Sequence, residues 1–103
     1  MGVFVVRSRV REECVGEVEA GIGTMISAIE QEQPKGVRYA YGKLPDGVTF
    51  LALLELEDGV ENPLPGIPAC REFQENLRNN LLAESPASGP EPLTVLGSYG
   101  LFG

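Results

Sequence analysis

The chain has 103 residues, 43% of them hydrophobic, and this length suits one globular domain spanning residues 1–103. Fifteen acidic residues outnumber eight basic ones, and a net charge of −7 argues against nucleic-acid binding because a phosphate backbone is repelled. No apolar run approaches the about 20 residues of a membrane helix, and the N-terminal apolar run is too short for a signal peptide. We therefore expect a cytoplasmic protein that has no membrane partner.

The first third of the chain predicts a strand over residues 3–10 and a helix over residues 12–33. In the second of these segments, apolar side chains recur at spacings of three and four and form one helical stripe. The stripe consists of Val15, Val18, Ile22, Met25, Ile26 and Ile29. The acidic pair Glu12-Glu13 suits the positive end of the helix dipole, and Pro34 marks the end of the helix.

A hairpin is predicted next, with strands over residues 37–44 and 48–57. Pro45 at the second turn position and Gly47 at the fourth match a type I turn followed by a glycine bulge. In the register that such a turn sets, Leu44 pairs with Val48. Ala40 and Gly42 then lie beside Phe50, where a helix can approach the sheet closely.

The second strand of this hairpin is apolar on both of its faces. Side chains alternate across a strand, so one face carries Phe50, Ala52, Leu54 and Leu56 and the other carries Leu51 and Leu53. Two helices cover one face of a sheet, and the other face needs a second cover. We expect that cover to be another copy of the protein. The predicted register places Tyr39 and Tyr41 beside Leu51 and Leu53, on the face left for the partner or for a ligand.

The second half of the chain predicts a helix and a final strand. Three prolines in residues 58–68 forbid a regular element there. A helix from Pro68 to about Glu84 buries a stripe formed by Cys70, Phe73, Leu77 and Leu81. A connector rich in proline, glycine and serine covers residues 85–92, and residues 93–102 predict the last strand. The order βαββαβ predicts an α+β, ferredoxin-like fold, with a four-stranded antiparallel sheet and both helices on one face.

Two cysteines leave their role open. Cys14 and Cys70 each fall near the start of a predicted helix, where the pKa of a thiol can be lowered. The alternative is that both are small buried side chains in a reducing compartment, and a disulfide between them also stays open. Neither cysteine has a second cysteine nearby and the chain has no histidine, so we expect no metal site.

The element order, the run Val37-Arg38-Tyr39, the pair Leu54-Glu55 and the stretch over residues 51–65 resemble the dimeric α+β barrel proteins. Within them, the chain is similar to the antibiotic biosynthesis monooxygenase-like family over residues 3–102. This resemblance implies a homodimer whose sheets close face to face, with a small-molecule cavity between each sheet and its own helices or loops. Members of the family include cofactor-free oxygenases, haem-degrading enzymes and small isomerases. The chain lacks the haem-ligating histidine of the haem-degrading branch and the tryptophan that some of the oxygenases place around the substrate. Both absences weaken the enzymatic interpretation, and we expect no cofactor.

Five residues are candidates for a catalytic site. Tyr39 and Tyr41 point to the same side of a strand, where they would flank a flat aromatic ligand or hold a phenol; the alternative is that they fill the dimer core. Arg7 or Arg38 would stabilise an enolate or peroxide anion while Glu55 takes a proton. The alternative for these charged residues is a set of salt bridges at the rim of the barrel.

Three further expectations concern the loops and the function. Arg7 and Arg9 share a face of the first strand, and Glu55 and Glu57 share a face of the third, so cross-strand ion pairs are predicted between them. Asn62 either donates its amide to a substrate carbonyl or forms an ordinary Asn-Pro turn. The sequence leaves two functions: a cofactor-free oxygenase or related enzyme acting on an aromatic or polyketide-like compound, and a non-catalytic homodimer that binds a small ligand or only assembles.

Overall fold

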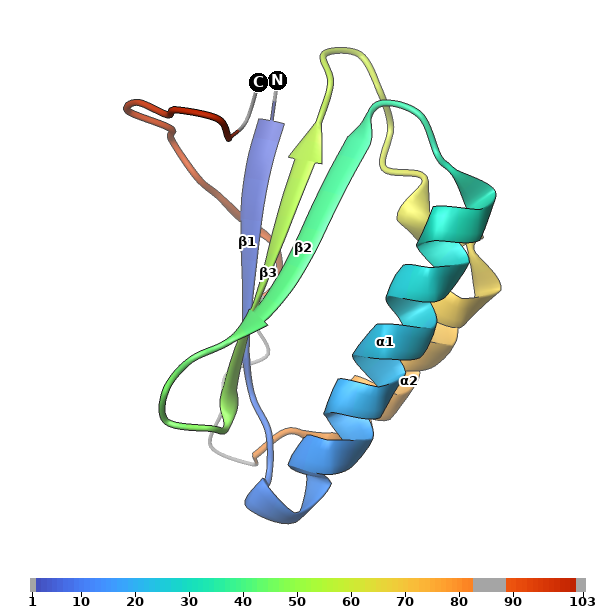
Figure 1. Cartoon of the computed structure of the whole chain (residues 1–103), viewed down its shortest axis with the longest axis vertical. Helices are drawn as coiled ribbons and strands as arrows, with labels where there is room; N and C mark the ends of the chain where they lie inside the picture. The colour runs from blue at the N-terminus through green and yellow to red at the C-terminus, as the bar shows by residue number, and fades with distance from the viewer. Residues whose placement is uncertain (1, 83–88, 102–103) are drawn as a thin grey trace.

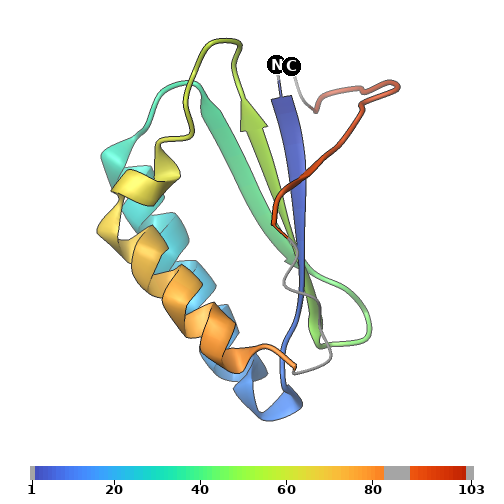
Figure 2. The same cartoon turned by 180° about the vertical axis from the view of Figure 1, so that it is seen from behind.

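The computed structural model describes residues 2–82 and 89–101. Its elements are β1 (Gly2–Arg9), η1 (Glu12–Cys14), α1 (Val15–Glu32), β2 (Val37–Lys43), β3 (Thr49–Leu56), η2 (Leu64–Gly66), α2 (Pro68–Asn80) and β4 (Glu91–Pro92). The four strands form one antiparallel sheet in the order β2-β3-β1-β4. Both helices lie on the same side of this sheet (Figures 1 and 2). The predicted α+β, ferredoxin-like arrangement is confirmed.

The helix α1 is shorter at its start than predicted because residues 12–14 form a 3-10 turn before it. It ends at Gln33, which has a φ of 47° and donates its backbone N–H to the Ile29 carbonyl at 2.9 Å. Pro34 follows and cannot continue the helix. Within the described ranges, no helix is long and apolar enough to cross a membrane.

The helix α2 begins at Pro68 and ends at Asn80, four residues before the predicted end at Glu84. The early end has a visible cause, because the chain becomes extended at Leu81 and forms a bridge with Val10. The backbone N–H of Leu82 then donates to the Arg9 carbonyl at 3.0 Å. These pairings satisfy backbone groups beyond the end of β1 in place of another helical turn.

The hydrophobic core lies between the helices and the sheet face that they cover. Its buried members are Val10, Val18, Met25, Phe50, Leu54, Leu64, Ile67, Cys70, Phe73 and Leu77. Phe50 on β3 and Met25 on α1 are each only 1% exposed. Two long side chains, one from each layer, therefore fill the space between the sheet and α1.

The turn between β2 and β3 differs from the prediction by one residue. Gly47 donates to the Leu44 carbonyl at 3.0 Å, as a type I turn requires, and its φ of 79° suits glycine. Strand pairing resumes at Thr49 rather than at Val48, however, because Leu44 donates to the Thr49 carbonyl at 2.8 Å. The predicted pairing of Leu44 with Val48 is therefore wrong.

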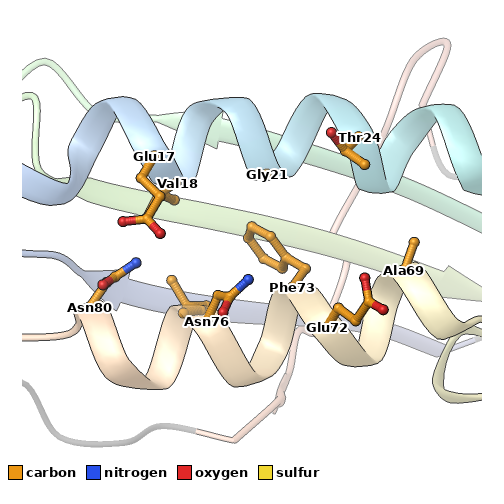
Figure 3. Close-up of a pocket in the computed structure, with 10 residues that line it drawn as sticks. Glu17, Val18, Gly21, Thr24, Ala69, Glu72, Phe73, Asn76 and Asn80 are labelled. Atoms are coloured by element: carbon orange, nitrogen blue, oxygen red, sulfur yellow. The ribbon is translucent and has the colours of Figure 1, made fainter.

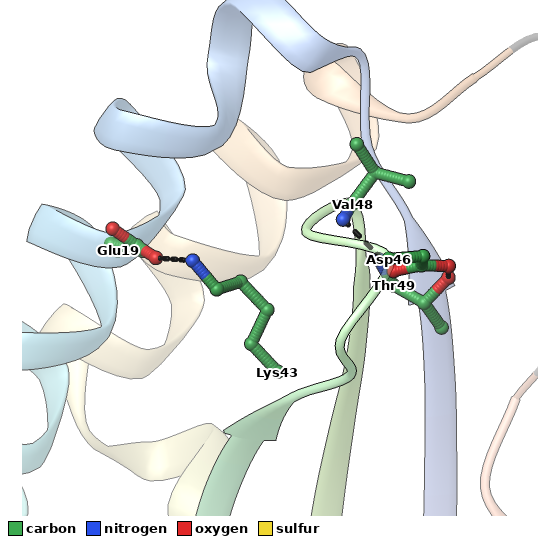
Figure 4. A network of polar contacts seen from close by, with 5 residues as sticks. All are labelled: Glu19, Lys43, Asp46, Val48 and Thr49. Atoms are coloured by element: carbon green, nitrogen blue, oxygen red, sulfur yellow. Dashed lines mark hydrogen bonds and ion pairs between the residues drawn. The ribbon is translucent and has the colours of Figure 1, made fainter.

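The side chain of Asp46 explains the longer turn (Figure 4). Its Oδ1 accepts the backbone N–H groups of Val48 at 3.0 Å and Thr49 at 2.9 Å, and its Oδ2 accepts the Thr49 hydroxyl at 2.5 Å. In a three-residue loop, the Val48 N–H would have bonded the strand-end carbonyl instead. The carboxylate thus captures this donor and delays the pairing by one residue.

A shift of one residue exchanges the faces of a strand. Tyr39 and Tyr41 pair with the β3 residues that face the helices, so they lie on the helix side. The opposite face, called the open face below, carries Val3, Val5, Arg7, Arg9, Arg38, Ala40, Gly42, Thr49, Leu51, Leu53 and Glu55. The prediction that both tyrosines lie on the face left by the helices is wrong. Leu51 and Leu53 do lie on that face, as predicted.

The same shift moves the small residues of β2. Ala40 and Gly42 were expected beneath a helix, and the register places them on the open face, opposite Leu53 and Leu51. Lys43 instead points to the helix side, where its Nζ forms an ion pair with Glu19 of α1 (Figure 4). The helices therefore approach β2 over its large side chains.

The last strand is much shorter than predicted. β4 consists of Glu91 and Pro92, which pair with Val5 and Phe4 of β1. Residues 93–101 were expected in this strand and have no strand structure, and residue 102 lies outside the described residues. Leu93 still donates its N–H to the Val3 carbonyl at 2.8 Å, and glycines at positions 97 and 100 weaken any extended pairing beyond it.

Replacing two glycines with alanine, one at a time, should separate the cost of backbone strain from the cost of a steric clash. Gly36 and Gly47 have φ values of 78° and 79°, but a Cβ at Gly36 would lie 2.8 Å from Val60 Cγ2, whereas Gly47 faces open space. We expect Gly47→Ala to lower the free energy of unfolding by about 1–2 kcal/mol through strain alone. Gly36→Ala should lose about 1–3 kcal/mol more because it is also overpacked. Urea denaturation measures both, and equal losses would contradict the contact with Val60.

Acid should weaken the β2–β3 turn. Hydrogen bonds from the Thr49 hydroxyl and the backbone N–H groups of Val48 and Thr49 hold the pKa of Asp46 below its ordinary value of 3.8. A lowered pKa adds stability above the unfolded value, and that stability is lost as the pH falls through the folded pKa. Urea midpoints for Asp46→Asn should therefore fall less with acid than those of wild type. Glu75→Gln, at an exposed carboxylate on α2, is the control and should follow wild type.

Candidate functional site

Two tyrosines form the first part of the candidate site, on the helix side of β2. Tyr39 and Tyr41 meet edge to face, with ring centroids 6.1 Å apart and planes at 75°. Tyr41 also meets Phe73 of α2 at 5.6 Å and Phe50 of β3 at 6.3 Å, again edge to face. This geometry is the favourable one for aromatic rings. The Tyr41 ring is therefore held between the sheet and α2.

Burial sets the chemistry of both phenols. It raises the pKa of Tyr39 well above the ordinary value of 10.0, and the neighbouring Tyr41 and Cys70 raise it further. It raises the pKa of Tyr41 to about 12, although hydrogen bonding with Ser8 acts in the opposite direction. Both hydroxyls are consequently neutral at physiological pH. They can donate a hydrogen bond to a ligand, but they cannot serve as bases.

The charged candidates form a second group on the open face. Arg38 Nε lies 3.7 Å from Glu55 Oε1, and the two residues are direct partners across β2 and β3. The Glu55 side chain is only 9% exposed, whereas that of Arg38 is 68% exposed. The separation is too long for a hydrogen bond, so the contact is an ion pair in which Arg38 is exposed to solvent and Glu55 is not. Its cation compensates the charge of a largely buried carboxylate.

The predicted ion pairs between the first and third strands are not aligned. β1 and β3 are neighbours, as expected, but the register places Arg7 opposite Leu51 and Arg9 opposite Thr49. Glu55 lies opposite Val3, four pairs away from Arg7. Its cationic partner therefore comes from β2, which is the neighbour on the other side.

The sheet separates the five candidate residues. Tyr39 and Tyr41 lie on its helix side, while Arg7, Arg38 and Glu55 lie on the open face. A sheet is one backbone layer thick, and packed side chains cover it on the helix side. Within one subunit, the phenols and the charged groups thus serve two different surfaces. Their catalytic roles stay predictions.

A groove of about 200 Å³ lies between α1 and α2 (Figure 3), and none of the five candidates lines it, although its Phe73 meets Tyr41. Its lining residues are Glu17, Val18, Gly21, Thr24, Ala69, Glu72, Phe73, Asn76, Leu77 and Asn80. Carboxylates and amides at its rim offer hydrogen bonds, and its floor is apolar. A Cβ at Gly21 would lie 3.1 Å from the Phe73 ring, so this glycine allows α2 to approach α1. The sequence pattern gave no signal for this groove because its residues come from two distant helix faces.

The remaining candidates have structural surroundings. Cys14 and Cys70 are buried, free thiols, and burial raises the pKa of Cys70 rather than lowering it. Arg11 Nη2 donates to Cys14 Sγ at 3.6 Å. Asn62 Oδ1 accepts the backbone N–H of Leu64 at 3.0 Å, the geometry of an Asx turn. Among the residues that the structure describes, no three potential metal-binding side chains come together.

Comparisons with family models, with curated proteins and with solved structures find no match for this chain. The arguments about function therefore rest on the geometry alone. That geometry is an α+β fold of βαββαβ order whose sheet has one face covered by helices and one face open.

Alkali should destabilise the chain through Tyr41. This phenol stays protonated up to about pH 12 in the folded chain, whereas an unfolded tyrosine ionises near 10.0. Its contribution to stability is complete below pH 10.0 and is lost as the pH rises toward the folded value. Urea midpoints of Tyr41→Phe should fall less steeply over this range than those of wild type. Equal slopes for Tyr41→Phe and wild type would contradict burial as the cause.

Proposed function

We propose that this protein acts as a homodimer whose two open faces close on one another, as an assembly or small-ligand-binding protein. One observation carries the proposal. Val5, Leu51 and Leu53 lie half-buried at the centre of the open face, with Ala40 and Gly42 beside them. In an antiparallel sheet with one face in water, side chains on that face are polar and those on the core face are apolar. The centre of the open face is apolar instead.

The charges around this apolar centre also favour a partner. Arg38 and Glu55 flank it on one side and Arg7 and Arg9 on the other, while small residues on β2 leave the centre flat. An apolar centre with a polar rim is the ordinary anatomy of a protein interface. A second copy supplies the same surface, so a twofold contact places apolar centre against apolar centre.

The finer family assignment belongs to this proposal. The order of the elements, the sheet order β2-β3-β1-β4 and the placement of both helices on one face agree with a dimeric α+β barrel of the antibiotic biosynthesis monooxygenase-like kind. In such an assembly the open face is the interface, and the space between sheet and helices holds the ligand. A cytoplasmic location is part of the same proposal.

One observation favours a second candidate function, that of a cofactor-free oxygenase or related enzyme acting on an aromatic compound. Tyr39 and Tyr41 lie between the sheet and the helices, and their neutral hydroxyls are suited to hold a phenol or a carbonyl group. Native mass spectrometry of the purified protein distinguishes the two functions. A co-purified aromatic compound that the protein converts with oxygen, and that Tyr39→Phe and Tyr41→Phe release, would support the enzyme. A compound that is bound without conversion would favour ligand binding, and a dimer of bare chains would favour assembly.

A charge at the centre of the open face should prevent dimerisation without unfolding the chain. Burying the unpaired carboxylate of Leu53→Glu costs several kcal/mol, so we expect the dimer to weaken by about a hundredfold or more. Ile26→Glu on α1 replaces another half-buried aliphatic side chain outside the packed core and should dimerise normally. Leu77→Glu in the core should lose stability instead.

Sedimentation and far-UV circular dichroism together measure these outcomes. The Leu53→Glu chain should show the helical signal of wild type and the mass of a monomer. A folded wild-type monomer at micromolar concentration would sink the proposal.

A further inference from the structure

The residues after β4 form an apolar segment without a place in the sheet. This C-terminal arm, residues 93–101, extends from the sheet on the side opposite the helices (Figures 1 and 2). Leu96 is 97% exposed, Tyr99 is fully exposed and Leu101 is 64% exposed. The arm contains no charged residue. A cluster of large exposed apolar side chains of this kind marks a contact with another molecule.

The strand register explains why the arm leaves its own sheet. β4 runs antiparallel to β1, and Leu93 still donates its N–H to the Val3 carbonyl at 2.8 Å. In this register the arm residues after Thr94 have no described residue of β1 opposite them, since the structure describes β1 from Gly2. The segment is nonetheless rich in residues that favour strands, among them Val95 and Tyr99. It has the composition of a strand, and beyond Leu93 it pairs with no strand among the residues of its own subunit that the structure describes.

The opposite edge of the sheet offers the matching surface. Leu44 and Thr49 are bonded at one end of the β2–β3 ladder, and Glu57 donates to the Gly36 carbonyl at 2.9 Å at the other. Inward and outward groups alternate along an antiparallel strand. The N–H and C=O groups of the intervening odd-numbered residues, from Val37 to Lys43, consequently point outward from the sheet. Such an edge is a template for an added strand.

We propose that the arm of one subunit pairs, as an added strand, with the outer edge of β2 in a second copy. The arm starts at the β1 edge of its own sheet, and β3 and β1 separate it from its own β2. The arm of another copy has no such obstacle, and a twofold dimer makes the exchange reciprocal. This inference rests on the proposed closure of the open faces, which brings the two sheets together.

Cross-linking between two differently marked chains tests the pairing. One chain carries Lys43→Cys, at an exposed residue of β2 that points away from the open face, and the other carries Ser98→Cys in the arm. Mixing them with a bismaleimide should give a cross-linked heterodimer, since a bond between the two marks can only be intermolecular. Gly23→Cys, on the exposed surface of α1, replaces Lys43→Cys in the matched control and should give none. Wild-type chain measures the background from the buried Cys14 and Cys70.

Truncation after Val95 gives an independent readout. Sedimentation should show a dimer weakened by about tenfold or more, because aromatic side chains such as Tyr99 are common interface hot spots. Far-UV circular dichroism should stay that of wild type because residues 96–101, the described part of the removed segment, lie outside the sheet.

The outcomes separate this inference from the dimer itself. If wild type is a dimer but the Lys43→Cys and Ser98→Cys chains give no cross-linked heterodimer, or if the truncated form associates as tightly, the arm exchange is overturned and the closure of the open faces still stands. A wild-type monomer at micromolar concentration overturns both, and the arm would then serve a different partner.

Discussion

Three hydrogen bonds to one carboxylate decide how this molecule is arranged. Asp46 holds the start of β3, and its capture of the Val48 N–H adds a fourth residue to the β2–β3 loop. Because strand faces alternate, that residue determines whether Tyr41 lies beneath the helices or on the open face. The aromatic packing against Phe73, the ion pair of Lys43 with Glu19 and the flatness of the open face all follow from it.

The two faces of the sheet consequently have different structural roles. On the helix side, Tyr41 joins Phe50 and Phe73 in edge-to-face contacts, so β2 contributes to the core although it is an edge strand. On the other side, an apolar centre and an Arg38–Glu55 ion pair lie on a surface that the helices do not reach. A single subunit completes the first arrangement. The second is completed only when another surface covers it.

Much of the fold was predictable from the sequence, because the spacing of apolar residues indicates the helices and prolines mark where they start or stop. The stripe ending at Ile29 with Pro34 after it, and Pro68 at the start of α2, gave the helices and their order correctly. The faces of β2 were not predictable, since a Pro-Asp-Gly turn fits two loop lengths, and the bonds of Asp46 together with the packing of Tyr41 on Phe73 favour one of them. The last strand failed for another reason: strand propensity in residues 93–101 carries no information about whether a partner strand lies alongside. For the candidate site, the sequence named plausible residue types but could not show that the sheet divides Tyr39 and Tyr41 from Arg7, Arg38 and Glu55.

The close approach at Gly21 has its own consequence for motion. The Phe73 ring lies near enough to α1 that even a methyl group at this position would press against it. Sliding either helix along the other would carry the ring over neighbouring side chains that are bulkier than hydrogen. This contact opposes sliding of the two helices along one another. We therefore expect the two helices to move together, as a tilt of the whole helical layer relative to the strands.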